Sequence, residues 1–222
     1  MEHLHFNEIA STQSHLIELL NQGSDTKLVS AKEQTSGRGR SSNTWDSYEN
    51  SLAFSFIAES ATTPTLTSLE IGVLICKFAK NSQLSLKWPN DIINSEGQKC
   101  GGILIQLINN IPVIGIGLNW GISKHNDSYK TPKGNIFNEA ISEDDYKNIP
   151  GDIYKYITNN RLTDSEIITE WNLLCSHKDK QVSIIDTAEA KGIFKKIGPF
   201  GEAYLDIDGN IQKFYAGSLI IH

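Results

Sequence analysis

Residues 84–119 read LSLKWPNDIINSEGQKCGGILIQLINNIPVIGIGLN, and this stretch decides the fold class. It holds three apolar runs of strand length, Leu84–Trp88, Cys100–Ile108 and Pro112–Asn119, with a turn predicted at Asn94–Gln98 between the first two. No helical pattern alternates with these runs, as it would in a chain of βαβ units. We therefore expect a largely antiparallel α+β sheet and not a doubly wound one.

Strand and helix signals continue on both sides of this stretch. A hydroxyl-capped helix is predicted from Ser11 to near Gly23, because Leu16 and its apolar neighbours follow a run of capping residues. Apolar patterns add strands and helices elsewhere in the first 178 residues. The strands are expected at Leu28–Ala31 and Leu52–Ile57, and the helices at Pro64–Lys80, Glu143–Asn159 and Asp164–Cys175.

The sequence pattern changes after Lys178. Short strand candidates follow at Val182–Ile185, Ala190–Ile197, Ala203–Ile207 and Ile211–Ile221. Turn signals separate them, and the one at Asp208-Gly209-Asn210 marks a hairpin. We therefore expect two domains, residues 1–178 and a small β-barrel at residues 179–222.

Composition narrows the functional class. The chain has 222 residues, of which 39% are hydrophobic, so it can bury a packed core. Its net charge of −6 gives no general attraction to DNA or to an anionic membrane. No apolar run is long enough to span a bilayer, and the start of the chain lacks a signal-peptide pattern. Three distant cysteines form no metal spacing, which makes a reducing cytoplasm the simplest location.

The segment GRGRSSNTW, residues 37–45, is the most informative motif. Its glycines let the backbone approach an anion closely, and Arg38 and Arg40 supply forked donors for phosphate or carboxylate oxygens. A Gly–Arg stretch alone is more typical of a solvated basic loop. Gln34 just upstream and the large apolar Trp45 just downstream favour a ligand pocket.

The segment KWPND, residues 87–91, is expected at a strand end. Lys87 and Asp91 lie four residues apart, so together they could flank a phosphate and its metal ion. Pro-Asn-Asp is equally typical of a plain turn, and the segment alone leaves both interpretations open.

Two further segments place glycines inside strands. Lys99 enters a strand with Gly101 and Gly102, and GIGLN at residues 115–119 ends the next one. Glycines weaken a strand interior, so they indicate close approach of a ligand or of another backbone. A bulge with an exposed lysine remains the alternative for Lys99. Helix capping alone would likewise explain the Ser11–Thr12 hydroxyls.

Taken together and in this order, these segments resemble the biotin–protein ligase (biotin–[acetyl-CoA-carboxylase] ligase) family, and the likeness runs from Ser11 to the C-terminal β module. The resemblance implies a catalytic domain similar to that of class II aminoacyl-tRNA synthetases, followed by an SH3-like barrel. It implies a C–N bond-forming ligase that makes biotinyl-5'-AMP from biotin and ATP with Mg²⁺. The biotin then passes to a lysine of a biotin carboxyl carrier protein, and AMP is released.

The resemblance also implies residue roles. The expected biotin-binding residues are Ser11, Thr12, Gln34, Gly37, Arg38, Lys99, Gly101, Gly102, Gly115 and Gly117. The expected ATP-binding residues are Arg40, Trp45, Lys87, Asn90, Asp91 and Asn119, and Asp91 is also the expected magnesium ligand. Catalysis is assigned to Lys99, Arg38 and Arg40.

The sequence departs from the family pattern at two places. Ser42 and Asn43 stand where many members have a glycine and a basic residue before the tryptophan. Near the end, Ser218 falls in an Ala-Gly-Ser-Leu run in place of the usual Gly-Glu motif, so no role is assigned to it. Some members carry an N-terminal helix-turn-helix domain. Few residues precede Ser11, so we expect no binding to a specific DNA site.

Other functions remain open. A lipoate–protein ligase would share the fold class and the adenylation chemistry. A non-catalytic biotin or nucleotide binder would retain the pocket without turnover. A tRNA-binding protein similar to class II synthetases fits less well, because the chain is acidic and lacks an anticodon-binding domain. The sequence leaves open whether the protein is a monomer or a homodimer.

Overall fold

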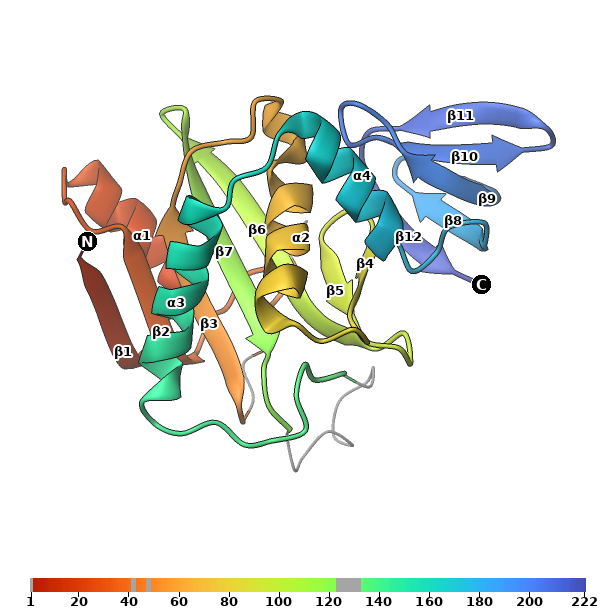
Figure 1. The fold of residues 1–222 in the computed structure, drawn as a ribbon. Coiled ribbons are helices and arrows are strands. Elements are labelled where there is room, and N and C mark those ends of the chain that lie inside the picture. Colours follow the sequence, from red (N-terminus) through yellow and green to blue (C-terminus); the bar gives the residue numbers. More distant parts are fainter. Residues whose placement is uncertain (1, 41–42, 47–48, 123–132) are drawn as a thin grey trace.

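A seven-stranded sheet forms the centre of the larger part of the molecule, and a five-stranded sheet lies beside it (Figure 1). The computed structural model describes residues 2–40, 43–46, 49–122 and 133–222. The elements up to the end of the large sheet are β1 His3–Ile9, α1 Thr12–Asn21, β2 Leu28–Gln34, β3 Ser51–Ile57, the 3-10 turn Pro64–Leu66, α2 Thr67–Ala79, β4 Ser85–Lys87, β5 Asp91–Ile93, β6 Lys99–Ile108 and β7 Ile111–Asn119. The remaining elements are α3 Asp145–Asn159, α4 Asp164–Leu174, β8 Gln181–Ile185, β9 Glu189–Ile197, β10 Ala203–Ile207, β11 Asn210–Phe214 and β12 Ser218–Ile221.

The large sheet has the strand order β1-β2-β3-β7-β6-β5-β4. Only the β1–β2 pair is parallel among the strand pairs of the described residues, so the expected antiparallel α+β class is confirmed. The longest pair is the β6–β7 hairpin, which places Gly102 opposite Gly117 and Leu104 opposite Gly115. Glycines from both strands therefore meet at the middle of the sheet.

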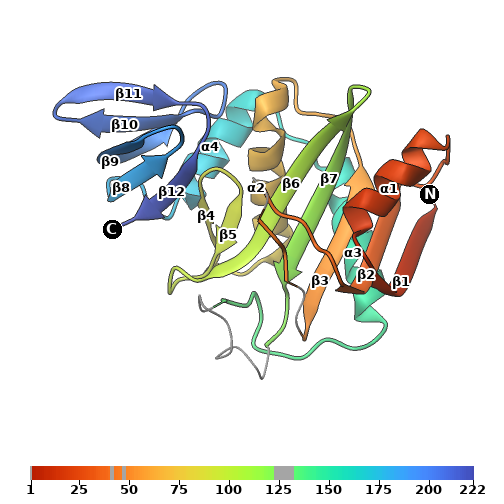
Figure 2. The same cartoon turned by 180° about the vertical axis from the view of Figure 1, so that it is seen from behind.

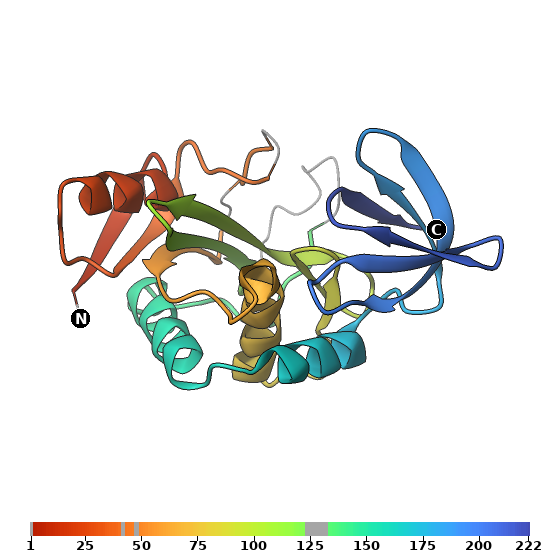
Figure 3. The same cartoon turned by 90° about the horizontal axis from the view of Figure 1, so that it is seen from above.

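Helices cover both faces of this sheet. Figure 3 shows α2, α3 and α4 on one face, and α1 with the segment that follows β2 on the other. Strand β3 is buried along almost its whole length because it is covered on both sides. Its Phe54 and Phe56 rings lie nearly parallel in the core, with ring centroids 6.3 Å apart. The α1 face carries the candidate site described below.

Local sequence explains where two helices begin. Ser11 caps α1, because its Oγ accepts a hydrogen bond from the backbone N–H of Ser14 at 3.3 Å. Thr163 and Glu166 form a reciprocal capping box at the start of α4. The cap at Ser11 fixes where the chain turns from β1 into α1, and therefore where Thr12 lies.

The C-terminal sheet has the order β11-β10-β9-β8-β12 and is antiparallel, as an SH3-like domain requires. The predicted hairpin is confirmed between β10 and β11, where Asp208 and Gly209 have positive φ. The expected single strand Ile211–Ile221 is wrong. It divides into β11 and β12 at Gly217, whose φ is 125°. The described strand pairs leave β11 and β12 at opposite ends of the sheet, so the sheet is consistent with the expected SH3-like domain but is not closed as a barrel.

The sequence prediction missed two strands of the large sheet. Strand β1 has only scattered apolar residues, and β5 has only three residues, so neither gives a clear periodic signal. The turn at Asn94–Gln98 consequently joins β5 to β6, and the Trp88–Asn90 turn joins β4 to β5.

The C-terminal sheet lies against α4, β4 and β5 (Figure 2). Trp88 Nε1 donates to the carbonyl oxygen of Gly201 at 2.9 Å, and the backbone N–H of Ile197 donates to Asn172 Oδ1 at 3.0 Å. These contacts hold the second sheet next to the KWPND turn. Within the described residues, no helix is long and apolar enough to cross a membrane.

Candidate active site

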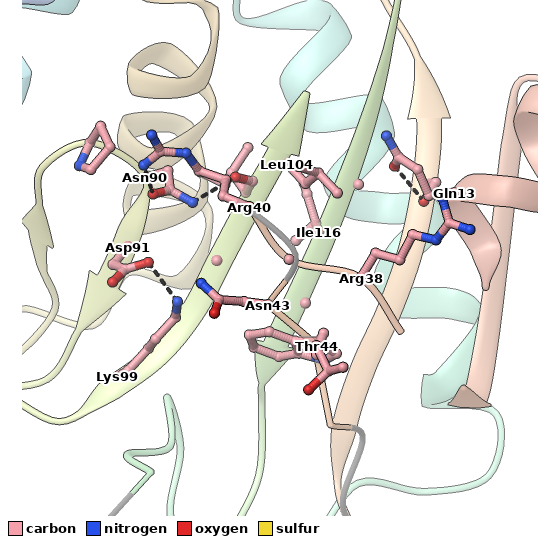
Figure 4. Close-up of a pocket in the computed structure, with 18 of the residues that line it drawn as sticks. Gln13, Arg38, Arg40, Asn43, Thr44, Asn90, Asp91, Lys99, Leu104 and Ile116 are labelled. Atoms are coloured by element: carbon pink, nitrogen blue, oxygen red, sulfur yellow. Dashed lines mark hydrogen bonds and ion pairs between the residues drawn. The ribbon is translucent and has the colours of Figure 1, made fainter. Parts of the chain in front are cut away.

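A cavity of about 260 Å³ opens on the α1 face of the large sheet (Figure 4). It is bordered by the start of α1, the loop after β2, the β4–β5 turn, strands β3, β6 and β7, and the start of β12. The segments that the sequence singled out separately therefore meet in one place. The predicted residues that line it are Ser11, Thr12, Gln34, Arg38, Arg40, Trp45, Lys87, Asn90, Asp91, Lys99, Gly102, Gly115 and Gly117.

Three predicted residues lie outside this lining. Gly37 borders a neighbouring hollow together with Arg38 and Arg40. Gly101 packs tightly against Leu118 and the backbone of β7. Asn119 is buried beneath β6, and its Nδ2 donates to the carbonyl oxygens of Lys99 and Gly134. In this structure these residues support the backbone of the site.

Amide and hydroxyl groups form one end of the cavity, which we call the polar floor: Thr12, Gln13, Gln34 and Ser55. Thr12 donates to Gln34 Oε1 from its backbone nitrogen at 2.8 Å and from its Oγ1 at 3.0 Å. Thr12 and Ser55 are buried, with their hydroxyl oxygens 2.9 Å apart. The polar floor therefore offers several fixed hydrogen-bonding atoms to a neutral polar ligand.

Cations gather at the other end. Lys99 Nζ lies 2.6 Å from Asp91 Oδ1, and Lys87 Nζ lies 3.9 Å from Asp91 Oδ2. Arg40 Nη1 donates to Asn90 Oδ1 at 3.1 Å, and Asn90 Nδ2 donates to the carbonyl oxygen of Ile103 at 2.9 Å. Two lysines beside the Asp91 carboxylate, together with Arg40 beside Asn90, leave a positive excess at this end of the cavity, which suits polyphosphate or a pair of anions.

The Gly–Arg segment folds back on itself as a narrow loop. The backbone N–H of Gly39 donates to the carbonyl of Asn43 at 2.8 Å, and that of Trp45 donates to the carbonyl of Gly37 at 3.0 Å. Figure 4 shows the result: Arg38 lies at the Gln13 end of the cavity and Arg40 at the Asn90 end. Ser41 and Ser42, which belong to the same predicted loop, lie outside the described residues.

Trp45 forms a wall of the cavity over β7. A Cβ atom on Gly117 would lie 2.2 Å from Trp45 Cε2, so the indole occupies the space that this glycine leaves open. Lys99 Nζ lies 6.0 Å from the Trp45 ring centroid. Gly117, the second glycine of the GIG run, therefore provides room for an aromatic side chain. The sequence alone predicted that some group approaches this strand closely, but not that the group is Trp45.

No cysteine of the site is suited to nucleophilic catalysis. Cys100 follows Lys99 in β6, but its side chain is buried, and burial raises the pKa of its thiol to about 12. The protonated thiol is a poor nucleophile near neutral pH. The chemistry of this site therefore depends on hydrogen bonds and cations.

Several lining residues were missed by the sequence analysis: Gln13, Asn43, Thr44, Ser55, Ile103, Leu104, Ile116, Ser218 and Leu219. A single serine inside the apolar run LAFSFI was a usable signal for Ser55, because a lone polar residue in a buried strand needs a partner. Ser218 had no such signal. It reaches the cavity only because β12 folds back beside the large sheet.

Comparison with known protein families matches the same region of the chain that forms most of the cavity. Residues 6–123 match the model of the biotin/lipoate A/B protein ligase family. The chain belongs to this family. The matched range contains the polar floor, the Gly–Arg loop, KWPND, Lys99 and both glycine-bearing strands.

Two bacterial relatives are similar in sequence over part of their length. The bifunctional ligase/repressor BirA of Bacillus spizizenii is 34% identical over 143 residues, covering 58% of this chain and 43% of the relative. That of Bacillus subtilis is 35% identical over 133 residues, covering 53% of this chain and 40% of the relative. The chain thus matches less than half the length of these curated relatives.

Solved structures are similar over nearly the whole fold. The biotin protein ligase of Aquifex aeolicus in complex with biotin and ATP superimposes with a TM-score of 0.80 at 22% identity, covering 100% of this chain and 99% of that one. The biotin acetyl coenzyme A carboxylase synthetase of Helicobacter pylori with bound biotinylated ATP gives a TM-score of 0.73 at 26% identity, covering 95% and 98%. The expected fold, apart from barrel closure, is therefore confirmed.

Proposed function

We propose that this protein is an ATP-dependent biotin–protein ligase. The observation that carries the proposal is a single cavity with an amide-rich polar floor at one end and Lys99, Lys87 and Arg40 at the other. A substrate with a neutral ureido ring and a carboxylate tail matches this division. The family membership and the biotin- and ATP-bound structural neighbours support it.

The reaction has two steps. First, a biotin carboxylate oxygen attacks the α-phosphorus of ATP, and the bond to pyrophosphate breaks. Two anions must meet in this step, and Lys99 and Arg40 lie where they can reduce the repulsion. Next, a neutral lysine amine of a biotin carboxyl carrier protein attacks the acyl carbon, forms the amide and releases AMP. The Gly–Arg loop borders the cavity and would exclude water from the labile adenylate.

Residue roles follow the two ends of the cavity. Ser11, Thr12 and Gln34 bind the ureido group, and Lys87, Asn90 and Arg40 face the phosphates. Gly102, Gly115 and Gly117 line the biotin slot, where Gly117 leaves room for Trp45 and Gly115 leaves room for the Gln13 amide. We assign residues 1–178 to catalysis and residues 179–222 to an SH3-like domain that supports it. Three free cysteines fit a cytoplasmic enzyme.

Magnesium fits the donor set through Asp91. Within the described residues no group of three His, Cys, Asp or Glu side chains forms a metal site. Magnesium is commonly held by one or two carboxylates together with substrate phosphates and water, so a lone carboxylate beside a phosphate site is sufficient. Asp91 would hold the ion, which would neutralise charge on the polyphosphate.

The test is incubation with ATP, Mg²⁺, biotin and an isolated biotin carboxyl carrier domain, followed by mass analysis of that domain. A mass increase of one biotin, dependent on ATP and on the acceptor lysine, supports the proposal. A parallel reaction with lipoate and a lipoyl domain tests the alternative ligase. Biotin binding without pyrophosphate release would identify a non-catalytic binder and contradict the proposal.

A further inference from the structure

Gln13 and Ser55 form a buried relay beneath Thr12 that the proposed chemistry does not use. Gln13 Nε2 donates to the carbonyl oxygen of Val113 in β7 at 3.0 Å. Its Oε1 accepts from Ser55 Oγ at 3.1 Å, and both side chains are buried. Ser55 Oγ in turn lies 2.9 Å from Thr12 Oγ1. The relay links α1, β3 and β7 at the polar floor of the cavity, which both side chains help to line.

The backbone of β7 makes room for this relay. Gly115 pairs with Ser55 across the β3–β7 ladder. A Cβ atom on Gly115 would lie 2.2 Å from Gln13 Oε1. The glycine that the sequence assigned to a biotin slot is therefore required first by the Gln13 amide. Ligand contact is not needed to explain it.

The partners of the two amides determine which atoms donate. A carbonyl oxygen such as that of Val113 only accepts, so the Gln13 amide must direct its nitrogen there and its oxygen toward Ser55. Gln34 Oε1 accepts from the backbone N–H of Thr12, which fixes its orientation in the same way. Neither amide can rotate by half a turn without losing one of these bonds.

Hydrogen counting then defines the role of Thr12. Each hydroxyl carries one hydrogen, and Ser55 donates its own to Gln13. The Thr12 hydrogen is used on Gln34 Oε1 or on Ser55 Oγ. In either arrangement the Thr12 hydrogen stays within the polar floor, so Thr12, which lines the cavity, keeps a lone pair on Oγ1 and has no hydrogen left for a ligand. It can therefore accept an N–H from a ligand but cannot donate to a carbonyl.

We infer that Gln13 and Ser55 are positioning residues that hold Thr12 as a hydrogen-bond acceptor, and so select ligands that carry an N–H group at this end of the cavity. The inference rests on the proposed function and deepens it. A ureido ring supplies N–H donors, whereas a dithiolane ring supplies none. The relay would thus favour biotin over lipoate without touching either ligand's reactive end.

The test compares four variants with the wild-type protein: Gln13→Met, Ser55→Ala, Ser55→Cys and the double variant Gln13→Met/Ser55→Ala. Calorimetry gives the Kd for biotin and for biotin methylated on a ureido nitrogen. Biotin-dependent ATP–pyrophosphate exchange gives KM and kcat. Ser30→Ala is the matched control, because Ser30 is equally buried in neighbouring β2, bonds His3 and His5, and does not line the cavity.

We expect each single change to raise the KM for biotin by about five- to tenfold, the effect of one lost hydrogen bond. The kcat and the KM for ATP should stay within about twofold, because a positioning role at this end affects binding only. The ratio of the Kd for the N-methyl analogue to the Kd for biotin should become smaller. Ser55→Cys keeps the side-chain volume, so it should behave like Ser55→Ala if the hydroxyl is what matters.

The double variant separates a relay from two independent contacts. Gln13→Met releases the Ser55 hydrogen, which then turns to Thr12 Oγ1 and competes with a ligand N–H for this acceptor. Removing Ser55 as well removes that competition. The double variant should therefore bind biotin no more weakly than Gln13→Met alone. The inference is overturned if the fold-changes in KM of the two single variants multiply in the double variant. It is also overturned if the KM for biotin is unchanged in folded variants, or if only kcat falls. A wild-type protein that binds no biotin would contradict the proposed function itself.

Discussion

Asp91 and Lys99 form an ion pair at the cationic end of the cavity, with Oδ1 and Nζ 2.6 Å apart. Both side chains reach the cavity from neighbouring strands, β5 and β6. In the proposed reaction, Lys99 must contact the anions of the substrates. In this structure its ammonium group is already paired with the Asp91 carboxylate. Substrate binding and this ion pair compete for the same ammonium group.

Replacing Lys99 should abolish adenylate formation. We expect Lys99→Met to fold normally and to lose at least about 100-fold in kcat/KM for pyrophosphate release, the scale typical of a preorganised electrostatic group. Lys77→Met is the control, because Lys77 pairs with Glu170 on the helical face. Near-normal pyrophosphate release by a folded Lys99→Met protein would remove Lys99 from the mechanism.

Replacing Asp91 should have opposite effects on binding and on rate. Asp91→Asn releases Lys99 from its partner, so we expect ATP without Mg²⁺ to bind several-fold more tightly. The rate at saturating Mg²⁺ should fall, because the proposed metal ligand is lost. Calorimetry with and without EDTA measures the first effect, and exchange kinetics over a Mg²⁺ series measure the second. Unchanged Mg²⁺ dependence would show that Asp91 does not hold the ion.

The pattern of apolar residues predicted the central β6–β7 hairpin of the large sheet but missed strands β1 and β5. Strands β6 and β7 were predictable because long apolar runs with strand-forming residues leave no alternative. Strand β1 was not, because His3, His5 and Glu8 interrupt its pattern and its pairing with β2 is a tertiary contact. Short or polar strands depend on neighbours that a local pattern does not contain.

The candidate site divides in the same way. Arg38, Lys99 and Asp91 were predictable because charged residues beside glycines and strand ends indicate ligand chemistry. Gln13 was missed because a polar residue in a first helical turn has ordinary structural explanations, and Ser55 was missed although a lone serine in an apolar strand was a usable signal. Their importance depends on a register that places Gly115 opposite Ser55, and no local sequence pattern specifies that register.

Gly117→Ala should displace Trp45. The added Cβ would lie 2.2 Å from Trp45 Cε2 and 2.5 Å from Cζ2, well inside van der Waals contact. We expect the indole to leave the strand, with a red-shifted tryptophan emission and a higher KM for both substrates. Gly151→Ala is the control. Its Cβ would meet no atom closer than 3.7 Å, and alanine should stabilise α3 by about 0.5–1 kcal/mol. Unchanged emission in Gly117→Ala would place Trp45 elsewhere.

Glu70 of α2 and Arg161, which lies between α3 and α4, form an ion pair in which the carboxylate is buried. Arg161 Nε and Nη2 donate to the two Glu70 oxygens at 2.8 and 2.6 Å, and the Glu70 side chain is fully buried. Arg161→Met leaves that carboxylate without its cation and should cost about 3–5 kcal/mol of stability. Urea unfolding measures this cost. The double variant Glu70→Leu/Arg161→Met should recover part of the loss, whereas additive losses would contradict a mutual interaction.

His177 lies at the junction between the two sheets. Its ring is fully buried beside Phe194, with centroids 4.2 Å apart, and Trp171. Its Nδ1 lies 3.2 Å from Ser176 Oγ, and its Nε2 is buried without a hydrogen-bond partner among the described residues. Burial, with smaller contributions from Lys87 and Lys180, lowers the pKa of His177 to about 3.

A lowered histidine pKa makes stability depend on pH in one direction. The folded protein favours the neutral ring, so the contribution of His177 is complete above pH 6.5 and is lost as pH falls from 6.5 toward 3. At pH 4.5 the loss should be roughly 2–3 kcal/mol. His177→Phe retains the aromatic packing and cannot titrate, so its free energy of unfolding should fall less between pH 7 and 4.5 than that of the wild-type protein. His3, also with a lowered pKa, is present in both proteins and cancels in this difference. Parallel pH profiles for the two proteins would show that His177 is not the group responsible.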